Sequence, residues 1–361
     1  MKLQRGFLSA LLVCFYASDT HAHSFNADGT HAGEPPSREA APQQPNDVLQ
    51  GLIDSAKVWE VEEDLTLCFM DGAIDTQEFF LQVVKDWENA APGLTIDGTV
   101  NGAPRNCADE VTELRISFNQ EGNWSYVGTD AEKIPAKEAT LNIGTLTGPL
   151  TNRLRKRTRG SILHEFGHAL GLKHEHQHPD SNCEAQLDWP TVYSAFEAFE
   201  VPWNKQKVDA NIRPIIAKEI ELTPYDRSSV MHYALPAKWF LQKTQATCYV
   251  EKANILSDGD KAIAAERYPA TLEEQKEYFD RLIGNAATVA GSDKFNRKDR
   301  ELFVEEFNAA LPQSIINVSG NVSMSQSGGI NVQGNVTDSA IIENFNGGAL
   351  NLNGGAVSAN D

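Results

Sequence analysis

One run of eleven residues constrains this chain more than any other feature: His164-Glu165-Phe166-Gly167-His168-Ala169-Leu170-Gly171-Leu172-Lys173-His174. Residues four apart lie one turn above each other on a helix, so His164 and His168 present two imidazoles on one face, at a separation suited to tetrahedral zinc. Glycine readily adopts left-handed backbone angles, so Gly171 can end the helix and return His174 to the open side of the metal. The run therefore predicts a zinc site with three histidine ligands.

The same run predicts hydrolytic chemistry. Three neutral imidazoles leave zinc its full charge and an open position for a water that ionises near neutral pH. Glu165 flanks that position and can take the proton of the water and pass it to a leaving amine. Each histidine alone could be an ordinary core or surface imidazole, but the complete pattern is very rare by chance. We expect His164, His168 and His174 to bind one catalytic zinc ion, Glu165 to act as general base, and no other cofactor to bind.

Two further features carry a resemblance to a known family. Ser229-Val230-Met231-His232-Tyr233 follows the zinc motif, and Glu175 comes directly after the third histidine. With His-Glu-x-x-His-x-x-Gly-x-x-His, these residues resemble the metzincin zinc peptidases, in the form typical of the astacin family. The resemblance implies that Met231 lies beneath the zinc and that Glu175 meets the N-terminus of the mature enzyme. It also implies that Tyr233 is catalytic, as an extra zinc ligand or as a hydrogen-bond donor to the oxyanion.

The resemblance covers roughly residues 47–269 and is strong at 164–180 and 226–233. Two positions depart from it, because Leu172 stands where phenylalanine is usual and His178 where arginine is common. It implies an α+β fold: a metzincin catalytic domain with a mixed twisted sheet, an active-site helix and a lower subdomain that holds the methionine turn. In such domains the strand before the helix, here Thr140–Gly144, would be the sheet edge that binds extended substrate. An ordinary core strand is the alternative.

Residue periodicity predicts the elements of this domain. Strands are expected at 65–70, 114–118 and 140–144, and helices at about 76–90, 159–170 and 260–268. Strand, helix, strand, strand and helix in that order describe a mixed sheet with helices packed on it. Two more helices are expected at 272–283 and 297–311.

The first residues predict secretion. Met1-Lys2-Leu3-Gln4-Arg5 is basic, and the apolar run from Phe7 to Ala17 is too short to span a bilayer. A signal peptide cleaved after Ala22 fits this pattern better than a short buried helix. The mature protein should then be extracellular, with no membrane partner, because no later run reaches the roughly 20 apolar residues of a spanning helix.

Cysteine usage agrees with an oxidising compartment. Loss of Cys14 with the signal leaves Cys68, Cys107, Cys183 and Cys248, an even number that predicts two disulfides. Four cysteines allow three pairings. We favour Cys68 with Cys107 and Cys183 with Cys248, because each pair would lie within one half of the domain. A zinc site made of these cysteines is the alternative, but it lacks a close Cys-x-x-Cys spacing.

Composition divides the chain into five parts. We expect a signal peptide at 1–22, a disordered prosegment or linker at 23–46, the catalytic domain at 47–270, a helical extension at 271–312 and a Gly/Asn/Ser-rich tail at 313–361. Asp28 faintly resembles the prosegment aspartate that fills the zinc site of astacin zymogens. In the tail, Ile316–Ser323 recurs as Ile330–Thr337, a repeat able to stack as β-structure or to remain disordered.

The net charge of the chain limits the kinds of partner that it can bind. The net charge of −19 argues against nucleic acid or an anionic membrane. Against this background the basic run Arg153–Arg159 could favour acidic substrate residues or be a cleavage site; a solvated charged loop is the alternative.

Two hypotheses for function follow. The first is a secreted zinc metalloendopeptidase, made as a zymogen, that hydrolyses proteins or peptides. The second is an extracellular binding or assembly protein that uses the peptidase fold as a scaffold and associates through the repeat tail. Neither substrate preference nor oligomeric state can be derived from the sequence.

Overall fold

The computed structural model describes residues 21–23, 47–198, 203–214, 223–292, 294–325 and 330–333. The expected signal peptide and prosegment, with Asp28, lie outside these residues except for 21–23, as does the tail beyond 333. Within the described ranges, no helix is both long and apolar enough to cross a membrane.

A mixed six-stranded sheet organises the catalytic region, as the α+β expectation requires. Its order is β1-β7-β8-β6-β2-β3. The strands are β1 (His21–His23), β2 (Asp64–Phe69), β3 (Thr95–Asp97), β6 (Leu114–Ser117), β7 (Asn123–Tyr126) and β8 (Leu141–Ile143). β3, β2, β6 and β8 run parallel, whereas β7 is antiparallel to β8 and β1 is antiparallel to β7.

The expectation that residues 140–144 form the sheet edge was wrong. β8 lies between β7 and β6, and its three residues are fully buried. β7 lies next to β8, and β1 adds to its other side as the last strand of the sheet, with His21 opposite Tyr126. β7 was not predicted because Asn-Trp-Ser-Tyr is short and mostly polar, and its partner strand lies in another part of the chain.

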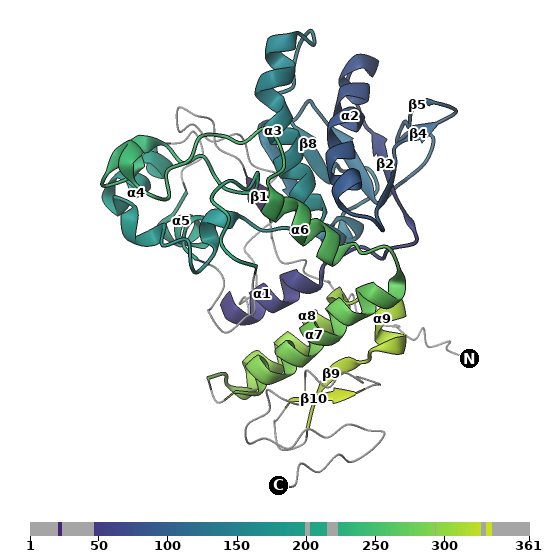
Figure 1. Ribbon diagram of the computed structural model, residues 1–361, viewed down its shortest axis with the longest axis vertical. Helices are drawn as coiled ribbons and strands as arrows, with labels where there is room; N and C mark the ends of the chain where they lie inside the picture. Colours follow the sequence, from purple (N-terminus) through teal and green to yellow (C-terminus); the bar gives the residue numbers. More distant parts are fainter. Residues whose placement is uncertain are drawn as a thin grey trace, which may run out of the picture.

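Two long helices pack side by side against this sheet (Figure 1). α2 (Ile74–Ala90) buries Phe79, Phe80, Val83, Val84 and Trp87, the side chains whose spacing predicted it. The indole N–H of Trp87 donates to the carbonyl of Leu163 on α3 (Asn152–Ala169) at 2.9 Å. This contact joins the two helices one residue before His164.

The basic run at 153–159 is helical, which corrects the expectation of a charged loop before a helix at Arg159. The Thr151 hydroxyl caps the helix by accepting a hydrogen bond from the backbone N–H of Leu154 at 3.2 Å. α3 therefore begins seven residues earlier than predicted. The Arg155 guanidinium lies 4.7 Å from the centre of the Phe79 ring on α2, which gives part of the run a packing role.

A smaller lobe follows the zinc motif. It has its own apolar cluster around Phe196, Trp203 and Trp239. Its elements are η2 (Glu175–Gln177), η3 (Glu184–Gln186), α4 (Trp189–Glu197), α5 (Lys205–Ile212), η4 (Ala237–Trp239) and η5 (Lys243–Gln245). The disulfide Cys183–Cys248 closes this lobe, and Cys68–Cys107 joins β2 to the loop before β6. Both predicted pairings are confirmed.

A C-terminal extension packs beneath the catalytic region (Figure 1). It contains α7 (Leu272–Gly291), α8 (Arg297–Ala310), α9 (Gln313–Val318) and the hairpin of β9 (Asn321–Met324) and β10 (Ile330–Gln333). Phe279 of α7 and Phe303 of α8 share one hydrophobic core with Leu52 of α1 (Asp47–Ala56) and with the sheet. The helical extension expected at 271–312 thus shares its core with the catalytic region. Short elements complete the described chain: β4 (Thr99–Val100), β5 (Ala103–Pro104), η1 (Gly128–Lys133) and α6 (Asp258–Arg267).

The two copies of the tail repeat adopt different structures. The first begins within α9 and continues into β9, whereas the described part of the second is the strand β10. The hairpin pairs Val332 with Val322, although the repeat aligns Val332 with Val318. Ile315, directly before the first copy, is fully buried in the core, so tertiary packing holds the helix α9 in which that copy begins. The described residues do not form stacked repeats.

A buried ion network joins α1 to the zinc loop. The Lys57 amino group donates to Asp54 at 2.8 Å and to Asp130 at 2.5 Å, and Lys173 pairs with Asp54 at 2.7 Å. The Lys57 carbonyl lies so near Gly171 that a Cβ there would be 2.7 Å from it. The network therefore fixes the backbone beside the turn that delivers the third histidine.

This network generates a stability prediction. Lys57→Met should lower the free energy of unfolding at pH 7 by about 3 kcal/mol, because buried carboxylates lose a cation. Burial opposes ionisation of Asp54, but Lys173 and Lys57 together lower its pKa below the ordinary 3.8. The stabilisation is thus present above about pH 4 and is lost as pH falls further. Urea unfolding measures both effects, with the exposed Lys85→Met as the matched control. Equal stability of the two variants at pH 7 would contradict the assignment.

Candidate metal centre and active site

The three histidine rings converge through their Nε2 atoms. The Nε2 of His168 lies 3.1 Å from that of His164 and 3.0 Å from that of His174. The local sequence explains this convergence, because α3 ends at Ala169 and Gly171 follows with φ +82°, as predicted. The N–H of Gly171 donates to the His168 carbonyl at 2.8 Å, which closes the helix and reverses the chain.

Each ring is held by its other nitrogen. His164 Nδ1 lies 2.8 Å from the carbonyl oxygen of Val230, and His168 Nδ1 lies 2.7 Å from that of Leu172. His174 Nδ1 lies 3.2 Å from Gln177 Oε1. A carbonyl oxygen can only accept a hydrogen bond, so each Nδ1 carries the proton and donates it. All three Nε2 atoms therefore present lone pairs to one point.

This donor set fits zinc. Three lone pairs at such distances cannot donate hydrogen bonds to one another, and they repel unless a cation lies among them. Zinc–nitrogen bonds of about 2.0–2.1 Å in a tetrahedral site separate the nitrogens by about 3.3 Å, close to the spacing found. Burial lowers the pKa of His164 to about 4 and that of His174 well below its ordinary value. These two imidazoles are thus neutral, the state in which imidazole binds metal.

Glu165 lies on the same face of α3 as the two helical histidines. It precedes His168 by three residues, so its side chain projects about 60° around the helix from that of His168 and about 100° from that of His164. The residue is fully buried. The spacing of the motif on α3 therefore brings the Glu165 carboxylate to the edge of the histidine cluster.

The methionine turn forms the floor of the cluster. A Cβ at Gly167, between the two helical histidines, would lie 2.4 Å from the sulfur of Met231, so only glycine lets the turn approach α3 this closely. Asp260 of α6 holds the turn, because its carboxylate accepts from the Ser229 hydroxyl at 2.6 Å and the Val230 N–H at 2.9 Å. Sequence reasoning missed Asp260, which it treated only as part of a helix start.

Tyr233 is buried against the histidines. Its ring centre lies 3.9 Å from that of His174 and 5.6 Å from that of His164, the latter nearly parallel. His176 also stacks on the Tyr233 ring, with ring centres 4.5 Å apart, and is fixed by the Asn211 carbonyl, 3.2 Å from its Nε2. His176 had no separate signal in the sequence. These packed rings determine the position of the tyrosine that the family resemblance singled out.

A second group of possible metal ligands is a structural cluster. Both sulfurs of the Cys183–Cys248 disulfide lie within 3.9 Å of the Nε2 of His232. Zinc is bound by cysteine thiolates, and the sulfurs of a disulfide are not thiolates. The Tyr225 hydroxyl contacts His232 Nε2 at 2.8 Å, and the Tyr233 carbonyl lies 2.9 Å from its Nδ1. His232 therefore braces Tyr233 through its backbone carbonyl, and the alternative of a cysteine-bound zinc finds no support.

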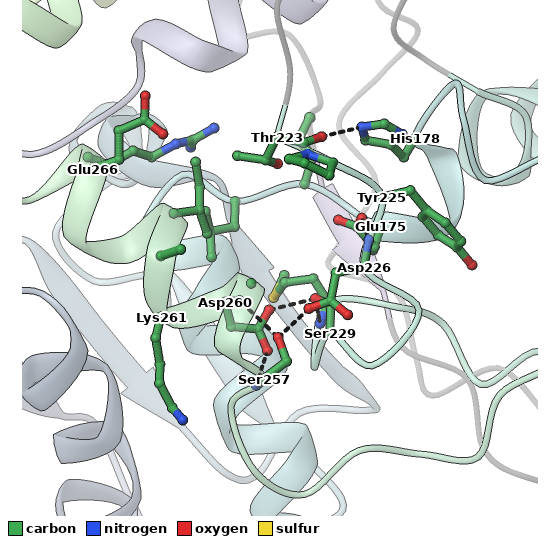
Figure 2. A pocket seen from close by; sticks show the side chains of 18 of the residues that line it. Glu175, His178, Thr223, Tyr225, Asp226, Ser229, Ser257, Asp260, Lys261 and Glu266 are labelled. Carbon is green, nitrogen blue, oxygen red and sulfur yellow. Dashed lines mark hydrogen bonds between the residues drawn. The ribbon is translucent and has the colours of Figure 1, made fainter.

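A cavity of about 990 Å³ lies behind His174 and the methionine turn. Figure 2 shows Glu175, Asp226 and Asp260 around it. Glu175 accepts a hydrogen bond from the Asp226 N–H at 2.6 Å, and burial raises its pKa to about 7. His178, at the position where arginine is common, is held at 2.7 Å from the Thr223 carbonyl. The cavity thus gathers carboxylates next to the third histidine.

Gln177 generates a prediction for metal affinity. Its amide N–H groups donate to the carbonyls of Ala210 and Arg213 at 3.1 and 3.0 Å, which points its oxygen at His174. Gln177→Leu removes the acceptor of the His174 N–H and should weaken zinc binding about 10- to 100-fold. Gln177→Glu keeps an acceptor and should bind more tightly than the leucine variant. Competition with a chromogenic chelator measures this, and unchanged affinity in Gln177→Leu would refute the assignment.

Comparison with known proteins agrees with this geometry. Residues 105–257 match the peptidase family Astacin. Among similar proteins, zinc metalloproteinase nas-26 of Caenorhabditis elegans is 35% identical over 72 residues, which cover 20% of this chain and 17% of that protein. High choriolytic enzyme 1 of Oryzias latipes is 35% identical over 78 residues, covering 22% of this chain and 24% of that protein.

Longer alignments are more divergent. Meprin A subunit beta of Rattus norvegicus is 27% identical over 221 residues, covering 55% of this chain and 28% of that subunit. The chain thus spans less than a third of the length of these three relatives. The structure of myroilysin aligns with a TM-score of 0.49 and 27% identity, covering 60% of this chain and 97% of that one. The family match includes the three histidines, Glu165 and the methionine turn, so residues 105–257 are a domain of the astacin family of peptidases.

Proposed function

We propose that this protein is a secreted zinc-dependent endopeptidase that hydrolyses peptide bonds within proteins or peptides. The single observation that carries the proposal is the convergence of three Nε2 lone pairs, two of them from the helix that also carries the buried Glu165. His164, His168 and His174 would hold the ion. When bound, zinc supplies a Lewis acid that acidifies a water molecule and polarises the scissile carbonyl.

Glu165 moves the proton in this proposal. As a carboxylate it accepts the proton of the attacking water and then gives it to the amine that leaves. Its place one turn before His168 on the same helix supports this role, because the same side chain must reach both the water and the scissile nitrogen. Burial keeps the proton from exchanging with bulk solvent during the transfer.

Tyr233 stabilises the oxyanion in this proposal. Its ring packs on the His174 ring, and this contact holds the tyrosine next to the histidine cluster. A phenolic O–H can donate a hydrogen bond to the negative oxygen that develops as the water attacks. Stacking on His176 supports this role, because it limits rotation of the ring away from the cluster.

The strand β7 binds the peptide backbone in this proposal, along the side on which β1 pairs with it. An extended peptide adds to an exposed strand through main-chain hydrogen bonds that depend little on side chains. The pairing of β1 with β7, with Ala22 opposite Ser125, supports it, because a segment of this chain already adopts that arrangement.

The precursor is a zymogen in this proposal. The family resemblance implies that the mature N-terminus pairs with Glu175, and the carboxylate-lined cavity beside that residue supports this. N-terminal sequencing of the active secreted form should find a start beyond residue 23. An active form that still begins at or before residue 23 would contradict processing of a prosegment.

The enzyme claim makes a direct prediction. Glu165→Gln removes the general base and should lower kcat/KM on casein by about 10²- to 10⁴-fold while zinc stays bound. A zinc chelator should abolish cleavage by the wild type, and added zinc should restore it. Cleavage that survives either change would refute the mechanism, and a zinc-loaded wild type that cleaves nothing would favour the binding or assembly hypothesis.

Tyr233→Phe tests the oxyanion role separately. Loss of one hydrogen-bond donor to the transition state should lower kcat by about 10²-fold with little change in KM. Zinc content should remain at one ion per chain, because the ring and its stacking are retained. A rise in KM with unchanged kcat would instead assign Tyr233 to ground-state binding.

A further inference from the structure

The Cys183–Cys248 disulfide packs against the His232 ring. The Nε2 of His232 lies 3.9 Å from the sulfur of Cys183 and 3.8 Å from that of Cys248. Both cysteines are fully buried, and His232 is buried with them. Side chains in a close-packed interior are held by their contacts, so the ring cannot shift toward the two sulfurs.

Hydrogen bonds hold both nitrogens of the same ring. The Nδ1 lies 2.9 Å from the carbonyl oxygen of Tyr233, which can only accept, so Nδ1 carries the proton and donates it. In a neutral imidazole the Nε2 then accepts, and its donor is the Tyr225 hydroxyl at 2.8 Å. The His232 ring thus connects the disulfide and Tyr225 to the backbone of Tyr233.

The two sulfurs belong to segments of the small lobe that are themselves anchored. The side-chain oxygen of Gln186 accepts hydrogen bonds from the Cys248 N–H at 3.1 Å and from the Thr247 hydroxyl at 3.0 Å. The Ser181 hydroxyl accepts from the Cys183 N–H at 3.2 Å. The disulfide therefore joins one fixed segment after the third histidine to another after the methionine turn.

Tyr233 is held both by its ring and by its backbone. The centre of its ring lies 3.9 Å from that of His174 and 4.5 Å from that of His176, while His232 bonds to its carbonyl. A misplacement of about 1 Å at a reacting centre can lower a rate by about 100-fold. A shift of the Tyr233 backbone would move its hydroxyl, so the contacts behind His232 are coupled to the step that the tyrosine assists.

Crosslinking of the chain does not by itself require this location. Cys68–Cys107 joins residues 39 positions apart and Cys183–Cys248 joins residues 65 apart, so the two bonds should stabilise the fold to a similar extent. Cys183–Cys248 differs in that both of its sulfurs contact the ring that bonds to Tyr233. The other disulfide is therefore a matched control for a role in catalysis.

We propose that the Cys183–Cys248 disulfide and Tyr225 position Tyr233 for catalysis, by holding the His232 ring that bonds to the Tyr233 carbonyl. This inference rests on the proposed endopeptidase function and on the oxyanion role of Tyr233. The disulfide and Tyr225 act through His232, so they are positioning residues. Because Tyr233 acts in the transition state, their contribution belongs to kcat rather than to KM or to zinc binding.

Removal of the disulfide tests this proposal in the active secreted form. Cys183→Ala with Cys248→Ala should lower kcat on labelled casein about tenfold, with KM within about twofold of wild type and the zinc ion retained. In the control, Cys68→Ala with Cys107→Ala, kcat should stay within about twofold of wild type. Both variants are assayed below their measured unfolding temperatures, so that loss of folded protein does not enter the comparison.

Tyr225→Phe makes a smaller change at the same ring and keeps the disulfide. Loss of its hydroxyl should lower kcat about threefold, because His232 then lacks one of its hydrogen bonds. The control is Tyr193→Phe, which removes a hydroxyl that donates to Asp209 in the same lobe and should leave kcat unchanged. This pair decides the question if the cysteine variant does not fold.

A double-mutant cycle separates positioning from general support of the fold. In a Tyr233→Phe background the hydrogen-bond donor is already absent, so removal of the disulfide or of the Tyr225 hydroxyl should change kcat by less than about twofold. A merely structural role would lower kcat by the same factor in both backgrounds.

The outcomes distinguish this inference from the proposed function. Equal effects in both backgrounds, or an unchanged kcat in Tyr225→Phe, would overturn the positioning role and leave the endopeptidase in place. A Tyr233→Phe variant that cleaves as fast as wild type would overturn the oxyanion role and this inference with it. A zinc-loaded wild type that cleaves nothing would overturn the proposed function itself.

Discussion

Three hydrogen bonds to the Nδ1 atoms of the histidines determine the geometry of the site. The carbonyls of Val230 and Leu172 and the amide oxygen of Gln177 each take the proton of one Nδ1, so the three Nε2 lone pairs must point inward. These acceptors come from three segments: the methionine turn, the turn after α3, and η2. The cluster therefore exists only when the large lobe, the small lobe and the reversal at Gly171 are in place together. Folding and metal binding are coupled through these acceptors.

Much of the remaining structure supports those three segments. Asp260 of α6 holds the methionine turn, and the absence of a side chain at Gly167 lets Met231 lie against α3. The Lys57 network holds the backbone beside Gly171, and Lys57 follows α1, whose apolar face shares a core with α7 and α8. The C-terminal extension is thus physically connected to the third histidine, although it lies far from it in sequence. This connection gives the extension a structural role within the catalytic unit.

The sequence predicted features that depend on local spacing. His164, His168 and Gly171 are separated by helical intervals, and the disulfide pairing followed from chain separation, so both were accessible without a structure. Features that depend on distant partners were not. β7 is recognisable only beside β8, and the position of β8 as an inner strand depends on it. Gln177 and Asp260 act through residues 3 and 30 positions away, and no pattern in the sequence relates them to the zinc motif.

The central claim is that the three Nε2 atoms bind one zinc ion and that the cysteine–histidine cluster does not. X-ray absorption at the zinc edge of the purified protein tests this most directly. The account predicts one zinc per chain with three nitrogen ligands at about 2.0–2.1 Å, completed by oxygen. Sulfur scatterers at about 2.3 Å would assign the metal to Cys183 and Cys248 instead, and a protein that retains no zinc would contradict the claim outright.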